Sequence, residues 1–169
     1  MSKSIIIYYS RAGENYLNGK IVDLIKGNTE IVADAIANFV HGDLFKIEQI
    51  IPYSYNYNEC TEEAHRDQVN RVRPKLKKYL ENVDEYDVIY LGYPNYWNTM
   101  PMAMFTFLEN IKPSGKIIKP FCTHEGSGLG RSEEDIKRLC PNCIVKEGLA
   151  IRGSHVNNSK GEIVKWLEK

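Results

Sequence analysis

The sequence predicts an α/β protein, a three-layer sandwich around a five-stranded parallel sheet. Short runs of β-branched and aromatic residues alternate along the chain with segments in which apolar residues have helical spacing. The chain has 169 residues, of which 43% are hydrophobic and 26% charged, and this is the usual size and composition of one globular domain. No repeat or Gly/Ser-rich linker divides it. We therefore expect a single domain over residues 1–169, with helices covering both faces of the sheet.

Five runs are typical of strands that are buried on both faces. The first is Ile5-Ile6-Ile7-Tyr8-Tyr9, and the others lie at 44–47, 88–93, 117–122 and 144–151. Apolar residues at helical spacing predict the intervening helices: Ile31, Ala35, Ile36 and Phe39; Leu76, Tyr79 and Leu80 after Pro74; Met104, Phe107 and Leu108 after Pro101; Ile136 and Leu139; and Ile163, Trp166 and Leu167. This strict alternation favours right-handed crossovers and a parallel sheet.

Charge and hydropathy narrow the classes of partner. The 22 Lys and Arg residues balance 22 Asp and Glu residues, and the sequence pI is about 6.9, so no excess positive field attracts phosphate backbones or anionic lipid. We expect neither nucleic-acid nor membrane binding. The first apolar run is too short for a signal peptide, and no run reaches the roughly 18 apolar residues of a membrane span. Together with only four unevenly spaced cysteines, this predicts a cytoplasmic protein.

Small and polar residues follow the first predicted strand, at the edge of a parallel sheet where ligands bind. They are Ser10, Arg11, Ala12, Gly13 and Asn15, and further along Gly27-Asn28-Thr29 opens the first predicted helix. Hydroxyl groups and free N–H groups at a helix N-terminus suit an anion such as a phosphate group. The alternative is that Asn28 or Thr29 only caps the helix. A P-loop and a dinucleotide-binding fingerprint are both absent from this segment.

The loop after the third predicted strand combines prolines, aromatic rings and polar side chains. It reads Pro94-Asn95-Tyr96-Trp97-Asn98-Thr99, and Pro101 follows closely. A stiff loop that presents rings and amides suits the face and edge of a flat heteroaromatic ligand. The alternative is that Tyr96 and Trp97 belong to the core.

A glycine-rich loop follows the fourth predicted strand and contains Glu125, Gly126, Ser127 and Gly128. Glycines at this density let the backbone approach a ligand closely or bend sharply. Ser127 is a poor candidate for a hydrolase nucleophile, because Glu125 stands where a nucleophile elbow has its leading glycine.

Taken together, these segments resemble the flavodoxin-like FMN proteins. The resemblance covers nearly the whole chain and is carried by Tyr8-Tyr9-Ser10-Arg11-Ala12-Gly13, Gly27-Asn28-Thr29, Gly92-Tyr93-Pro94-Asn95-Tyr96-Trp97 and Phe121-Cys122-Thr123-His124-Glu125-Gly126-Ser127-Gly128. It implies a sheet order of 2-1-3-4-5 and FMN as the cofactor. The implied binding residues are Ser10, Arg11, Asn28 and Thr29 around the phosphate, Pro94 to Thr99 along the isoalloxazine ring, and Glu125 to Gly128 over the pyrimidine edge and ribityl chain.

One departure from the family pattern concerns the phosphate loop. The family runs directly from the glycine to Asn-Thr, whereas residues 14–26 are inserted here. Either Asn15 or Asn28 is therefore a candidate for the phosphate contact.

Two functions fit such a flavoprotein. The first is an oxidoreductase in which FMN passes electrons to a small acceptor such as a quinone, and the second is an electron carrier that serves protein redox partners. Carriers of this family are typically strongly acidic, so the balanced charge favours the oxidoreductase. The aromatic segment 53–57 and the insertion 14–26 are expected to wall a small-molecule pocket or to form a subunit contact, which leaves a homodimer as an alternative. No side chain is assigned as the catalyst, because the flavin carries the redox chemistry.

The remaining conspicuous residues are interpreted as structural. Cys140 and Cys143 have the spacing of half a zinc site or a redox pair, but no second Cys/His pair accompanies them. Cys140 is also predicted at a helix C-terminus, where the dipole raises the pKa of a thiol. His124 is interpreted as a hydrogen-bonding or surface residue, and no metal site is predicted.

Overall fold

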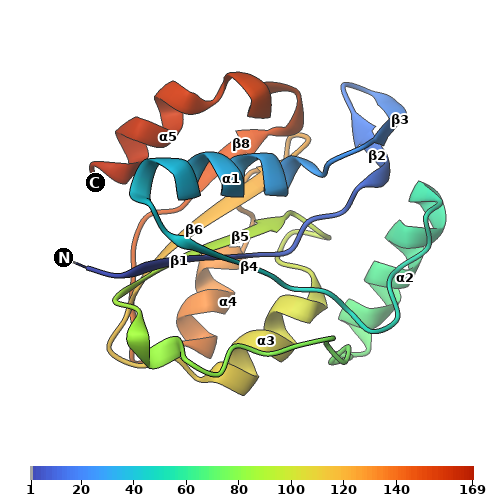
Figure 1. Cartoon of the computed structure of the whole chain (residues 1–169). Helices are drawn as coiled ribbons and strands as arrows, with labels where there is room; N and C mark the ends of the chain where they lie inside the picture. The colour runs from blue at the N-terminus through green and yellow to red at the C-terminus, as the bar shows by residue number, and fades with distance from the viewer. Residues whose placement is uncertain (1) are drawn as a thin grey trace.

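The structure is a computed structural model that describes residues 2–169, and it has a parallel sheet with helices on both faces (Figure 1). Neighbouring strands follow the order β4 (Asp43–Lys46), β1 (Ser4–Tyr8), β5 (Val88–Pro94), β6 (Ile117–His124) and β7 (Ile144–Val145), and β8 (Leu149–Arg152) also pairs with β6. Every pairing in this sheet is parallel. The helices are α1 (Asn28–Val40), α2 (Tyr57–Val69), α3 (Met102–Ile111), α4 (Ser132–Leu139) and α5 (Lys160–Leu167). The predicted fold class and the order 2-1-3-4-5 are confirmed.

Side chains of β1 alternate between the two faces of the sheet and join two cores. Ile5 and Ile7 pack in the core that contains residues of α3 and α4, whereas Ile6 and Tyr8 pack in the core that contains residues of α1 and α5. Burial on both faces explains why the first run of the sequence shows no polar alternation. The parallel pairing of β1 with β5 and of β5 with β6 places their carboxyl ends together at one edge.

The fifth predicted strand, at 144–151, is divided into two short strands. β7 and β8 both pair with β6, and residues 146–148 between them lie outside the strands. The Glu147 carbonyl in this break accepts a hydrogen bond from Trp166 Nε1 of α5 at 2.9 Å. The prediction of one continuous strand was wrong because the structure interrupts the run where α5 contacts it.

The helix predicted after Pro74 does not form. Instead, Gln49 and Leu76 form an isolated antiparallel bridge, and the Ile50 N–H donates to the Lys75 carbonyl at 2.9 Å. These pairings use backbone groups that a helix would need for its own hydrogen bonds. The prediction was therefore wrong, and the helix of this crossover is α2.

The sequence of α2 shows little helical periodicity, because only Cys60 and Ala64 are buried in it. Its start does carry a local signal. The side chain of Asn56, the N-cap residue, accepts the Glu59 N–H at 3.0 Å, and Asn followed three residues later by Glu is a capping-box pattern. In Figure 1, α2 stands beside the edge of the sheet where β1 and β5 end.

The insertion at 14–26, for which no element was predicted, forms a β-hairpin. β2 (Gly13–Leu17) and β3 (Lys20–Leu24) pair antiparallel in a separate two-stranded sheet. Asn18 and Gly19 connect them with φ values of 54° and 80°, and Asn-Gly is favoured at two-residue hairpin turns because both positions need positive φ. The hairpin lies beside the start of α1 (Figure 1) and breaks the strict alternation that the sequence predicted.

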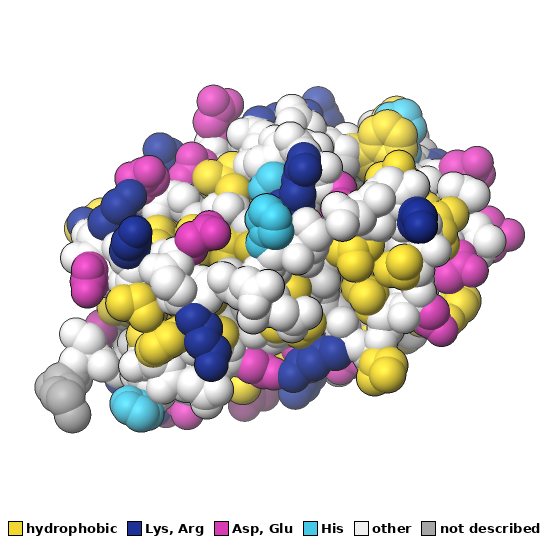
Figure 2. All heavy atoms as spheres, turned by 90° about the horizontal axis from the view of Figure 1, so that it is seen from above, with side chains coloured by type: hydrophobic (Ala, Val, Ile, Leu, Met, Phe, Trp, Pro, Cys, Tyr) yellow, Lys and Arg dark blue, Asp and Glu magenta, His cyan; other side chains and the backbone are white. Residues whose placement is uncertain are grey.

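Two short 3-10 helices, Val83–Glu85 and Gly153–Asn158, complete the described elements. Positive and negative side chains are interspersed on the face shown in Figure 2, in keeping with the balanced charge of the chain. Within residues 2–169, none of the helices is both long enough and apolar enough to cross a membrane.

Candidate functional site

A cavity of about 670 Å³ lies at the carboxyl edge of the sheet. Ligand pockets typically have volumes of about 300–1,000 Å³. The predicted residues that line it are Ser10, Arg11, Asn15, Asn28, Thr29, Pro94, Asn95, Tyr96, Trp97, Asn98, Glu125 and Ser127. Ala12, Gly13, Thr99, Gly126 and Gly128 belong to the same loops but are not part of the described lining. The fold thus brings the three predicted loops together around one space.

The start of α1 closely approaches the end of β1, because Gly27 leaves room for it. A Cβ at Gly27 would lie 2.2 Å from Ser10 Oγ. Gly27 is the N-cap residue, so Asn28 and Thr29 are helical residues and not caps, and Ser10 Oγ accepts the Glu30 N–H at 3.1 Å. The other N–H groups of the first turn have no acceptor within the helix, which makes this end of α1 suitable for an anion.

Thr29 connects this helix end to β6. The Thr29 side chain is buried, and its hydroxyl shares a hydrogen bond of 2.7 Å with the hydroxyl of Thr123. One hydroxyl donates and the other accepts, so this bond links the start of α1 to the end of β6.

Asn15 and Arg11 line the cavity, but both side-chain N–H groups of Asn15 and three of the five of Arg11 donate to backbone carbonyls. Asn15 Nδ2 donates to the carbonyls of Arg11 and Gly13 at 3.0 and 3.1 Å. The Arg11 guanidinium donates to carbonyls of the hairpin and of the segment before α2. Asn28, in contrast, lies in the first turn of α1.

The loop after β5 makes a tight turn. The Tyr96 N–H donates to the Thr99 carbonyl at 2.8 Å, and Trp97 and Asn98 between them have φ values of 52° and 72°. Such left-handed conformations are uncommon for residues other than glycine and are maintained only where the surroundings determine them.

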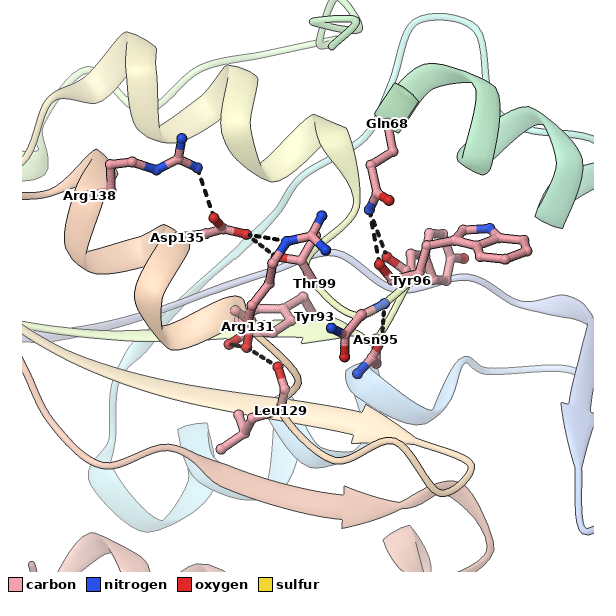
Figure 3. A network of polar contacts seen from close by, with 12 residues as sticks. Gln68, Tyr93, Asn95, Tyr96, Thr99, Leu129, Arg131, Asp135 and Arg138 are labelled. Atoms are coloured by element: carbon pink, nitrogen blue, oxygen red, sulfur yellow. Dashed lines mark hydrogen bonds and ion pairs between the residues drawn. The ribbon is translucent and has the colours of Figure 1, made fainter. Parts of the chain in front are cut away.

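Asn95 supplies part of that constraint. Its Oδ1 accepts the Asn98 N–H at 2.9 Å, and its Nδ2 donates to the Gly128 carbonyl at 2.8 Å, which links the loops after β5 and β6. Thr99 points the other way and donates to the carboxylate of Asp135 on α4 (Figure 3). Thr99 therefore anchors the loop to α4 and is not part of the described cavity lining.

The same loop is attached to α2. Gln68 Nε2 donates to the carbonyls of Tyr96 and Trp97 at 3.3 and 3.1 Å (Figure 3), and Trp97 Nε1 donates to the Thr61 carbonyl at 2.9 Å. The ring of His65 packs against the indole, with 4.2 Å between centroids. Trp97 is nevertheless 47% exposed, so it is not a core residue.

Glu125 has an unusual environment at the other side of the cavity. Its Oε2 accepts the Asn18 N–H from the hairpin turn at 3.2 Å, whereas its Oε1 is buried and has no hydrogen-bond partner among residues 2–169. A Cβ at Gly153 would lie 2.3 Å from Oε1 and 2.6 Å from Asn28 Nδ2. A buried carboxylate oxygen without a donor is costly, so this atom is suited to a hydroxyl or N–H group of a ligand.

His124 shapes the glycine-rich loop. Its Nδ1 accepts the Gly126 N–H at 2.9 Å, which requires that nitrogen to be unprotonated. Burial, together with the charge of Arg152, lowers the pKa of His124. The neutral form that the hydrogen bond needs is therefore favoured.

Several lining residues were not among the predicted binding residues. They are Tyr16, Tyr57, Cys60, Thr61, Ala64, Gln68, Thr123 and His124, and most lie on the hairpin or on α2. The capping-box pattern at Asn56 and the Asn18-Gly19 dipeptide were the available signals for those two elements. Gly153 was missed too, because it belongs to no sequence motif. Its close contacts with Glu125, Asn28 and Leu17 arise only where three segments meet in the folded chain.

The cysteine pair lies away from the cavity lining. Cys140 is buried at the end of α4, where burial, assisted by the neighbouring Cys143, raises its pKa to about 12. Cys143 Sγ donates to the Pro113 carbonyl at 3.2 Å. A thiol that is protonated at neutral pH is a weak nucleophile and a weak metal ligand.

Comparison with known proteins identifies the family. A family model described as flavodoxin matches residues 22–169. The chain belongs to the flavodoxin family. Flavodoxins are themselves a standard example of an open parallel sheet of order 2-1-3-4-5 with FMN at the point where the strand order reverses. In this flavodoxin-family chain, the cavity lies at the corresponding edge, by β1 and β5. No curated protein matches the sequence.

Solved structures share this flavodoxin fold over the whole chain. A Bacteroides eggerthii protein assigned as a flavoprotein is 28% identical, with a TM-score of 0.80 and coverage of 99% of this chain and 97% of that chain. A similarly assigned protein from Bacteroides uniformis is 23% identical, with a TM-score of 0.77 and coverage of 99% of both chains. A Lactobacillus acidophilus flavoprotein, solved in complex with FMN, is 18% identical, with a TM-score of 0.71 and coverage of 99% of both chains.

Proposed function

We propose that the chain is an FMN-dependent oxidoreductase whose acceptor is a small, uncharged molecule such as a quinone. Membership of the flavodoxin family and the FMN complex of the Lactobacillus acidophilus relative support the cofactor. FMN, when bound, carries two electrons from a reduced donor to a quinone, which also takes up two protons and leaves as the hydroquinone.

The residues around the cavity fit FMN. The start of α1, with the Ser10 hydroxyl and the Asn28 amide beside it, suits the phosphate, and the turn at Trp97 suits the flat ring. The unpartnered Glu125 Oε1 suits a hydroxyl donor such as the ribityl chain carries. In this arrangement the protein orients the flavin and limits its exposure to water, and no side chain is needed as the catalyst.

The observation that carries the choice of acceptor is the side of the cavity that α2 forms. Cys60, Thr61, Ala64 and Gln68 of this helix line the cavity, and none carries a charge at neutral pH. Gln68 and the indole of Trp97 link α2 to the loop after β5. The space beside that loop is therefore bounded by the loop on one side and by α2 on the other. A side of the cavity that is lined by uncharged residues favours a small neutral acceptor over the docking of a protein partner.

A steady-state assay with NADH or NADPH and a benzoquinone tests the proposal. Ala64→Leu places extra volume at this side of the cavity, so we expect a higher KM for the quinone while FMN remains bound. Glu62→Leu, on an exposed position of the same helix, is the matched control and is expected to behave as the wild type. Failure of the wild type to bind FMN, or absence of quinone turnover alongside rapid exchange with a redox protein, would contradict the proposal and favour the carrier.

A further inference from the structure

Arg11 lines the cavity, yet its guanidinium bridges two other segments of the chain. Nη1 donates to the carbonyl of Glu14 in the hairpin. Nη2 donates to the carbonyls of Ser54 and Tyr55, at 2.8 and 2.7 Å, in the segment that precedes α2. A planar guanidinium can satisfy several carbonyls at fixed angles, whereas an ammonium group acts as a single point charge.

Further contacts join the same two segments. The Glu14 carboxylate accepts the N–H of Tyr57, the first residue of α2, at 2.7 Å, and the rings of Tyr16 and Tyr57 stack with 5.8 Å between centroids. Gly13 makes room for the ring of Tyr55, because a Cβ there would lie 2.8 Å from Tyr55 Cε2. These contacts join residues 13–24 to residues 53–64, and the two segments together are here called the hairpin–α2 wall.

We propose that Arg11 is a positioning residue that holds the hairpin–α2 wall together and is not a ligand of the flavin phosphate. The inference rests on the proposed function only for the identity of the ligand. Three of the five N–H donors of Arg11 are engaged by carbonyls of both halves of the wall. Tyr16 and Tyr57, which belong to the wall, line the cavity. Arg11 therefore determines the shape of the site through the wall.

The ligand-free protein provides the first test. In Arg11→Met we expect faster amide hydrogen exchange in residues 13–24 and 53–64, because the hairpin and the start of α2 separate more often, and unchanged exchange in α5. Arg73→Met is the matched control, since Arg73 pairs with Glu109 at the surface, and it is expected to leave the wall unchanged. Unchanged exchange in the wall of Arg11→Met would overturn the proposal.

Flavin affinity provides the second test. A residue that acts through the hairpin–α2 wall should affect the binding of FMN and of riboflavin alike, because it does not contact the phosphate that distinguishes them. We therefore expect the dissociation constants of Arg11→Met for both ligands to rise by about tenfold or more, which corresponds to about 1.4 kcal/mol. A loss confined to FMN would identify Arg11 as a phosphate ligand and overturn the proposal. Ser10→Ala, which removes a hydroxyl beside the start of α1, is expected to show that FMN-selective loss.

Two variants keep the test decisive if Arg11→Met does not fold. Arg11→Lys retains the charge but cannot make the same set of bonds, so its wall should also exchange faster. Glu14→Gln weakens the contact to the Tyr57 N–H and should produce a smaller change of the same kind. If neither variant alters exchange in the wall, the proposal fails. If the wild type binds no flavin while the exchange results hold, the proposed function fails and the role of Arg11 stands.

Discussion

At Gly153, three segments meet where only a hydrogen atom fits. A Cβ there would lie 2.3 Å from Glu125 Oε1, 2.6 Å from Asn28 Nδ2 and 3.0 Å from Leu17 Cδ1. In Gly153→Ala we therefore expect displaced site residues, a loss of stability of about 1–3 kcal/mol and weaker FMN binding, measured by flavin fluorescence. Gly161→Ala in α5 is the control, because a Cβ there would meet no atom of another segment among residues 2–169 within 4 Å, and it is expected to gain about 0.5–1 kcal/mol. Unchanged FMN affinity in Gly153→Ala would contradict this view of the site.

His124 gives the protein a specific pH dependence. Because burial lowers its pKa in the folded state from the ordinary value of 6.5, the unfolded chain binds a proton first as the pH falls. Stability from this group is therefore present above about pH 6.5 and is lost progressively below it. Thermal unfolding of the apo-protein between about pH 8 and pH 5 measures the effect. We expect the stability of His124→Asn to depend less on pH than that of the wild type. His155→Asn, at an exposed position, is the control and should show the pH dependence of the wild type. Equal pH dependence in all three proteins would refute the role of His124.

At the scale of elements, α2 depends on its first turn, because it buries only Cys60 and Ala64. Asn56→Ala removes the cap of the Glu59 N–H, so we expect a loss of about 1 kcal/mol in unfolding free energy. The wall should also open more often, which raises the KM for a quinone more than it changes FMN affinity. Denaturant unfolding and steady-state kinetics measure the two effects. Asn58→Ala, at an exposed position in the helix, serves as the control, and an equal loss in both variants would argue against the cap.

At the scale of the whole molecule, the balance of 22 basic and 22 acidic residues predicts weak salt dependence. Electrostatic steering requires an excess of one charge sign, and it is screened as the Debye length falls from about 10 Å at 0.1 M to about 3 Å at 1 M salt. We therefore expect kcat/KM for a neutral quinone to change little over this range. A steep fall with salt would instead indicate a charged partner and favour the carrier function.

The sheet and most of its helices could be predicted because their signals are local. A buried parallel strand is a continuous apolar run, as in residues 5–9, and an amphipathic helix such as α3 repeats its apolar residues at helical spacing. The helix predicted after Pro74 was wrong because Leu76 meets Gln49, a partner far away in the sequence. α2 was missed because a helix that buries little has little periodicity to detect.

The sequence by itself determined the fold class and the three loops that surround the cavity, since these follow from the alternation of strands and helices and from the rule that ligands bind where parallel strands end. The strand order came from the resemblance to the flavodoxin-like proteins. Only the tertiary structure decided what each side chain does there. Arg11 donates to carbonyls of the hairpin and of the segment before α2, and Thr29 pairs with Thr123. The physical reason is that a hydrogen bond depends on the distance and direction between two groups, and for groups this far apart along the chain only folding sets them.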